Sequence, residues 1–156
     1  DYGVLTVPEL VEKYSLIYPD DADSIARWFE GLHLLPVERP AVWDRLHLLK
    51  EAGYHLYVLS NYGREIFEIH TKDRPFPADM DGMVVSGYIH MGKPEARIYR
   101  YLLDTYALDP AECVFFDDRD VNCTAGEAVG IRSLQILSEE QLIRILDLLL
   151  SEAEKA

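Results

Sequence analysis

A short apolar stretch that runs directly into two adjacent carboxylates constrains this chain more than any other feature. Residues 113–116 are Cys-Val-Phe-Phe, and Asp117 and Asp118 follow at once. Burying a carboxylate without a partner is costly, whereas the carboxyl edge of a parallel sheet lets paired acids converge on a hard cation such as Mg²⁺. An Asp-rich turn that begins a helix is the simpler alternative, so this segment alone predicts a buried strand with an acidic end.

Two segments upstream also end in polar side chains. Residues 55–59 are mostly apolar and lead into Ser60 and Asn61, with Gly63 and a helical pattern beyond. A hydroxyl, an amide and backbone N–H groups at the start of a helix can hold an anion. Lys93 precedes a further segment with helical spacing, and taken alone it is most simply a surface charge.

Helical and strand patterns alternate along the chain, which predicts an α/β fold with parallel strands and right-handed crossovers. Thr6 and Glu9, and later Ser138 and Gln141, have the spacing of capping boxes that open helices. We expect strands near 55–60, 83–86, 113–117 and 132–137, and helices near 7–18, 22–32, 41–52, 64–70, 94–108, 121–129 and 139–149.

Composition limits the class of protein. A length of 156 residues with 49% hydrophobic residues is enough for one core and a small appendage. The formal net charge of −13 argues against nucleic acid or an anionic membrane as a partner, and no segment is long enough to span a bilayer. Cys113 and Cys123 lack metal-ligand spacing, so we expect reduced, buried thiols and a cytoplasmic location.

Taken in order, the polar groups form a recognisable set. Ser60 and Asn61, then Lys93, then Asp117 and Asp118 with Asn122 four residues on, resemble the second, third and fourth motifs of the haloacid dehalogenase-like hydrolase superfamily. The resemblance covers the chain from about residue 2 to residue 136. It implies a Rossmann-like parallel-sheet core, residues 37–156, and the remnant of a helical cap, residues 1–36, joined by a proline-containing linker at 36–40.

The resemblance also implies a Mg²⁺-dependent phosphatase of small phosphorylated metabolites, with sugar phosphates as the favoured class. Ser60, the Asn61 backbone and Lys93 would bind the phosphoryl group. A phosphoryl transition state spreads negative charge over several oxygens, and a lysine and a metal ion stabilise that charge.

The fourth motif would hold the metal ion. By the same resemblance Asp118 is the direct Mg²⁺ ligand, Asp117 is a catalytic acid in the outer shell or paired with the lysine, and Asn122 orients the group. Catalysis would therefore rest on Lys93 and Asp117.

One family residue has no counterpart in this sequence. Members attack with an aspartate that follows the first strand, and Asp1 is rejected as a match because no strand precedes it here. We expect the chain to begin inside the cap, with the nucleophile outside residues 1–156. The central slot of the sheet would be filled by an N-terminal segment, a swapped element or re-paired strands, so these residues alone should be neither active nor a well-behaved monomer.

Two alternatives stay open. A 2-haloacid dehalogenase needs no metal and carries Ser-Ser-Asn in its second motif, and the Asp117–Asp118 pair speaks against it. A catalytically inactive binding protein is favoured by the missing nucleophile.

The five histidines are scattered without metal-ligand spacing, and Trp28 is expected to pack in the core.

Overall fold

The computed structural model describes residues 3–35 and 38–155. Short 3₁₀ turns lie at Pro19–Asp21, Gly31–Leu34, Phe76–Asp79 and Pro110–Glu112. The strands are β1 Tyr57–Ser60, β2 Gly82–Val85, β3 Val114–Asp117 and β4 Arg132–Gln135. The helices are α1 Val7–Ile17, α2 Ala22–Glu30, α3 Pro40–Glu51, α4 Arg64–Thr71, α5 Ser86–Ile89, α6 Ala96–Tyr106, α7 Asp120–Glu127 and α8 Glu139–Ala153.

The strands are parallel, as predicted, but they form two separate pairs. β1 pairs with β2, with Ser60 opposite Val85, and β3 pairs with β4, with Asp117 opposite Gln135. No backbone ladder joins the two pairs within the described residues. The α/β class is therefore confirmed, and the sheet is divided between β1 and β3.

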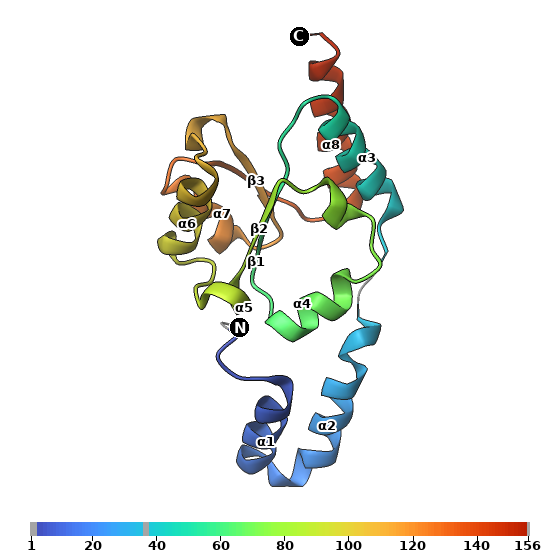
Figure 1. Cartoon of the computed structure of the whole chain (residues 1–156), viewed down its shortest axis with the longest axis vertical. Coiled ribbons are helices and arrows are strands. Elements are labelled where there is room, and N and C mark those ends of the chain that lie inside the picture. The colour runs from blue at the N-terminus through green and yellow to red at the C-terminus, as the bar shows by residue number, and fades with distance from the viewer. Residues whose placement is uncertain (1–2, 36–37, 156) are drawn as a thin grey trace.

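Helices cover the strands from two sides. α6 and α7 lie on one side and α3 and α8 on the other (Figure 1). The first apolar cluster centres on Ile98 and Tyr99, both 0% exposed, and includes Val84 of β2. The second joins Leu49 of α3 to Leu146 of α8, which are 2% and 1% exposed. Burial of these side chains supplies most of the driving force for folding.

α1 and α2 form a hairpin that extends away from the strands at one end of the molecule (Figure 1). The capping box at Thr6 is confirmed, with Glu9 Oε2 accepting from the Thr6 amide at 2.7 Å. Neither helix contains a buried residue, so the prediction that Trp28 packs in the core is wrong: its side chain is 59% exposed. The expected boundary between residues 36 and 37, and Pro36 of the linker, lie outside the described residues.

Hydrogen bonds to α4 help to attach this hairpin, and the 3₁₀ turn that follows it, to the rest of the protein. The Val7 amide donates to Glu65 Oε2 at 3.0 Å. His70 Nε2 lies 2.6 Å from the Leu32 carbonyl, and its Nδ1 lies 2.5 Å from the Tyr62 hydroxyl. A carbonyl only accepts, so Nε2 carries the proton. His70 is therefore a buried histidine with both ring nitrogens satisfied.

Three local predictions need correction. Ser86 begins α5 and does not extend β2. At the last helix Ser138 caps the Gln141 amide at 3.2 Å, but the Gln141 side chain accepts from the Leu137 amide, so the reciprocal half of the capping box is displaced by one residue. Cys113 is half-buried, whereas Cys123 is buried; both are free thiols.

The contact between α3 and α8 makes a stability prediction possible. Leu146→Ala removes a fully buried side chain and should lower the free energy of unfolding by about 2–5 kcal/mol. Leu148 lies on the same helix and is 63% exposed, so Leu148→Ala should change it by less than about 0.5 kcal/mol. Urea unfolding of both variants measures the difference, and equal effects would show that α8 does not pack on α3 as described.

Candidate active site

The polar groups named by the sequence gather where β1 and β3 end. Ser60 is the last residue of β1 and Asp117 the last residue of β3. Parallel strands bring such carboxyl ends to the same edge. Lys93 enters from the loop between α5 and α6, so residues from three separate parts of the sequence meet here.

A buried ion pair connects the two strand pairs. Lys93 Nζ lies 2.6 Å from Asp117 Oδ2, and the two side chains are 9% and 5% exposed. The same ammonium donates to the Leu59 carbonyl of β1 at 2.6 Å and lies 5.3 Å from the centre of the Phe115 ring. The Lys93 ammonium thus connects β1 to β3, which are not joined by backbone hydrogen bonds.

The other oxygen of Asp117 is also occupied. Oδ1 accepts from the Arg119 amide at 2.9 Å and from Asn122 Nδ2 at 2.8 Å. Burial by itself raises the pKa of this carboxyl, but the bonds from Lys93, the Arg119 amide and Asn122 together lower the pKa below its ordinary value. Asp117 is accordingly held as a carboxylate that faces the lysine.

Asn61 fixes the backbone that carries the lysine. Its Nδ2 donates to the Lys93 carbonyl and its Oδ1 accepts from the Lys93 amide, each at 2.7 Å. Such a two-way amide contact resembles a strand pair and determines the position of the lysine main chain. The Asn61 side chain therefore positions Lys93.

The loop after β1 is held by a tight approach to α5. Ser86, 0% exposed, accepts from the Tyr62 amide at 2.9 Å and donates to the Tyr62 carbonyl at 3.2 Å. A Cβ at Gly87 would come within 2.3 Å of the Arg64 amide nitrogen. Only glycine permits this contact, and the contact sets the direction in which α4 begins.

Two of the predicted site residues stand apart from this cluster. Ser60 lines a small cavity of about 270 Å³ together with Trp43 and Phe76, whereas the Lys93 ammonium donates to the Leu59 carbonyl and to Asp117. Asp118 is exposed, and its carbonyl accepts from Gln135 Nε2 at 2.9 Å. The expected convergence of Asp117 and Asp118 is therefore wrong, because Asp117 turns inward to the lysine and Asp118 turns to solvent.

Tyr99 is a site residue that the sequence reading missed. It is fully buried, and its hydroxyl donates to the Asn122 carbonyl at 2.7 Å. Burial raises its pKa, and the charge of Asp117 raises it further. A helix position next to Ile98 and four residues before Leu103 indicated burial, but nothing in the sequence indicated which carbonyl the hydroxyl would reach.

The donors of the fourth motif fit a magnesium ion that takes most of its ligands from water and phosphate. Asn122 Oδ1 is buried and has no hydrogen-bond partner, and Asp118 offers an exposed carboxylate on the same turn. Mg²⁺ takes oxygen ligands and commonly uses one or two carboxylates with waters and substrate phosphates. Over residues 3–35 and 38–155, no three His, Cys, Asp or Glu side chains form a metal cluster of their own.

Removing one member of the buried ion pair should be costly. Lys93→Met leaves Asp117 charged without its cation and should lower the free energy of unfolding by about 3–5 kcal/mol. The double variant Lys93→Met/Asp117→Asn should lose clearly less than the sum of the single variants. Arg39→Met, which breaks the more exposed pair with Glu139, is the control and should cost less than about 1 kcal/mol. Strict additivity at Lys93 and Asp117 would contradict the pairing.

The lowered pKa of Asp117 has a consequence for acid stability. A carboxyl whose pKa is lower in the folded state contributes stability above its unfolded pKa of about 3.9, and this is lost as pH falls through the folded pKa. The difference in unfolding free energy between the parent and Asp117→Asn should therefore shrink as pH falls below about 4. Chemical unfolding at a series of pH values measures it, and a constant difference would show that the carboxylate is not specifically stabilised.

The comparisons with known proteins agree on one family. A family model described as haloacid dehalogenase-like hydrolase matches residues 10–130, which is well over half of the chain. Across the described residues, no helix is long and apolar enough to cross a membrane.

Three curated relatives illustrate the range of this match. The drimenol cyclase drtB of Aspergillus calidoustus is 28% identical over 91% of this chain, which spans 28% of the cyclase. The pyrophosphatase PpaX of Bacillus velezensis is 24% identical over 81% of this chain, which spans 61% of that enzyme. The sesquiterpene phosphatase astK of Aspergillus oryzae is 29% identical over 58% of this chain, which spans 46% of it.

A solved structure supports the same fold. A HAD family enzyme of Bacteroides thetaiotaomicron, in complex with magnesium and inorganic phosphate, superimposes with a TM-score of 0.71 at 21% identity. The match covers 88% of this chain and 72% of that enzyme. With a family model matched over residues 10–130 and this architecture, the chain belongs to the haloacid dehalogenase-like hydrolases.

Proposed function

We propose that this hydrolase is a Mg²⁺-dependent phosphatase of small phosphorylated metabolites, which works through an aspartyl-phosphate intermediate. The observation that carries the proposal is the buried Lys93–Asp117 pair at the carboxyl ends of β1 and β3. The printed names of a pyrophosphatase and a sesquiterpene phosphatase among the relatives support a phosphate substrate. A 2-haloacid has a single carboxylate and gives no reason for a metal ion beside Asp118.

In this proposal Lys93 neutralises the charge of the transferring phosphoryl group. Asp117 orients the ammonium, and Asn61 holds the main chain from which the lysine extends. Phosphoryl transfer depends mainly on positioning and on cationic stabilisation of the oxygens. Ser60, at the end of β1, would donate a hydrogen bond from its hydroxyl to the same group.

Asp118 and the unpartnered Asn122 Oδ1 would hold the magnesium ion. When bound, the ion supplies further neutralisation of the phosphoryl oxygens. The magnesium and inorganic phosphate in the Bacteroides thetaiotaomicron enzyme support this assignment. Asn122 also donates to Asp117, so one side chain would connect the metal site to the lysine.

The acceptor carboxylate would come from a segment outside residues 1–156. The support is the division of the sheet: β1 and β3 are not paired with each other, and unpaired backbone groups of buried strands favour addition of a strand. A strand between them would end beside Lys93. The substrate would be bound without nucleic acid or membrane, and the two free thiols are typical of a cytoplasmic protein.

Phosphate should stabilise the folded protein if Lys93 binds a phosphoryl group. Inorganic phosphate or vanadate with Mg²⁺ should raise the melting temperature, because a ligand of the native state alone stabilises it by mass action. Differential scanning fluorimetry measures the shift, with Leu148→Ala as a control that keeps it and Lys93→Met as the variant that loses it. Protection by 2-haloacids and none by phosphate would instead identify a dehalogenase.

Asp118 should contribute to the affinity for Mg²⁺, and the nearby Asp120 should not. With phosphate present, Asp118→Asn should weaken Mg²⁺ binding at least about tenfold, since it removes the one carboxylate that the proposed site takes from the described residues. Asp120→Asn, an exposed acid at the start of α7, should leave it unchanged. Isothermal titration calorimetry measures the Mg²⁺ affinities. Equal affinity in Asp118→Asn and the parent would show that Asp118 is not a ligand of the ion.

A further inference from the structure

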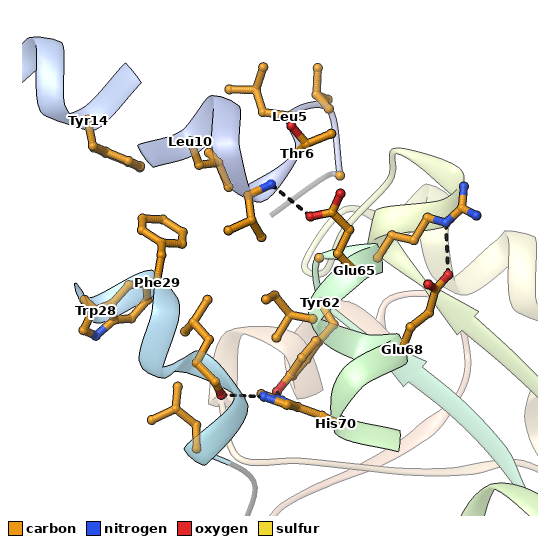
Figure 2. A pocket seen from close by; sticks show the side chains of 18 of the residues that line it. Leu5, Thr6, Leu10, Tyr14, Trp28, Phe29, Tyr62, Glu65, Glu68 and His70 are labelled. Atoms are coloured by element: carbon orange, nitrogen blue, oxygen red, sulfur yellow. Dashed lines mark hydrogen bonds and ion pairs between the residues drawn. The ribbon is translucent and has the colours of Figure 1, made fainter. Parts of the chain in front are cut away.

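A large cavity lies between the α1–α2 hairpin and the start of α4. Its volume is about 1240 Å³, well above the roughly 300 Å³ at the lower end of small-molecule sites. Aliphatic and aromatic side chains from both helices of the hairpin face it (Figure 2). They include Leu10 and Tyr14 of α1 and Ile25, Trp28 and Phe29 of α2.

Polar side chains of α4 that line this cavity are hydrogen-bonded within the protein. Glu65 accepts from the Val7 amide. Both nitrogens of His70 are engaged, one with the Leu32 carbonyl and the other with the Tyr62 hydroxyl. Small-molecule sites recognise hydroxyl groups through a few polar groups that point at them. A sugar in this cavity would therefore meet mainly apolar walls.

The charged side chains that line the cavity also disfavour binding of an anionic group, such as a second phosphate in addition to the one at Lys93. Among the described residues that line the cavity, Arg64 is the only one with a guanidinium or ammonium group, and it pairs with Glu68 at 3.1 Å. The Tyr88 hydroxyl donates to the same carboxylate at 2.9 Å. Glu65 adds a further carboxylate. An anion would be repelled here, so the part of a ligand that fits is uncharged.

The cavity borders the candidate active site at the loop after β1. Asn61, whose side chain holds the Lys93 main chain, is one of the lining residues, as is Tyr62. A ligand whose phosphoryl group lies at Lys93 therefore meets this cavity at the loop after β1.

We propose that the cavity binds the uncharged, apolar chain of an alkyl or alkenyl phosphate monoester, with the phosphoryl group at Lys93. This inference rests on the proposed function and names its substrate class. It differs from the sugar phosphates that the family resemblance favours, because the walls are mostly apolar, and Glu65 and His70 among them are already hydrogen-bonded within the protein. Trp28, more than half exposed in the unliganded protein, is the side chain that such a chain would cover.

The test compares three phosphates by calorimetry in the presence of Mg²⁺: ethyl phosphate, hexyl phosphate and glucose 6-phosphate. A fully buried methylene contributes about fourfold in affinity, so the four added carbons of the hexyl ester should tighten binding by at least about tenfold. Glucose 6-phosphate should bind no better than the ethyl ester. In Trp43→Phe, hexyl phosphate should also move the Trp28 emission to shorter wavelength, and ethyl phosphate should not.

Two matched variants test whether the hexyl chain binds next to Trp28. Trp28→Ser should remove most of the gain from the hexyl chain and leave the affinity for inorganic phosphate unchanged. Leu16→Ser should change neither; Leu16 lies on α1 and is 77% exposed, and it is not part of the lining.

Two outcomes would overturn the inference and leave the proposed function intact: equal binding of the ethyl and hexyl esters, or tighter binding of glucose 6-phosphate. A hexyl effect that survives in Trp28→Ser would place the chain elsewhere and would also overturn it. Failure of every phosphate, inorganic phosphate included, to bind the parent would overturn the proposed function, and the inference with it.

Discussion

The Lys93–Asp117 ion pair is the interaction on which the rest of this structure depends. It joins the two strand pairs through one ammonium that contacts Leu59 in β1 and Asp117 in β3. A buried pair of this kind contributes little net stability, because desolvation of both charges offsets their attraction. Removal of one member of the pair is costly, because the other charge is then buried without a partner. The role of the pair is to place a charge at the carboxyl ends of β1 and β3.

Hydrogen-bonded side chains surround this pair, and apolar side chains pack around them. Asn61 and Asn122 hold the two partners from either side, and Tyr99 in turn bonds to the Asn122 carbonyl. The apolar cluster of α6 then packs around Tyr99. On the far side, α4 connects the loop after β1 to the α1–α2 hairpin, so whatever occupies the cavity under the hairpin acts on the same loop that holds the lysine.

The sequence was sufficient for the order of the elements and for the ordered motifs, since strand ends followed by polar residues give a strong local signal. It was insufficient where the outcome depends on packing between distant segments. Trp28 has the large apolar side chain typical of a core residue, yet it is 59% exposed on α2. Asp117 and Asp118 are adjacent in sequence and were expected to converge, but Asp117 ends β3 and is buried against Lys93, whereas Asp118 lies beyond the strand and is exposed. The pairing of His70 with Leu32 spans 38 residues, and no local pattern encodes it.

The most direct measurement of the central claim is a ¹⁵N NMR spectrum of the lysine side chains. A buried ammonium bonded to Asp117 and to the Leu59 carbonyl should exchange its protons slowly and give a resolved signal that Lys93→Met removes. Inorganic phosphate with Mg²⁺ should shift that signal, because the phosphoryl oxygens become its new neighbours. If no slowly exchanging signal from Lys93 is found, or if phosphate leaves it unchanged, the ion pair is not the phosphoryl-binding centre of this protein.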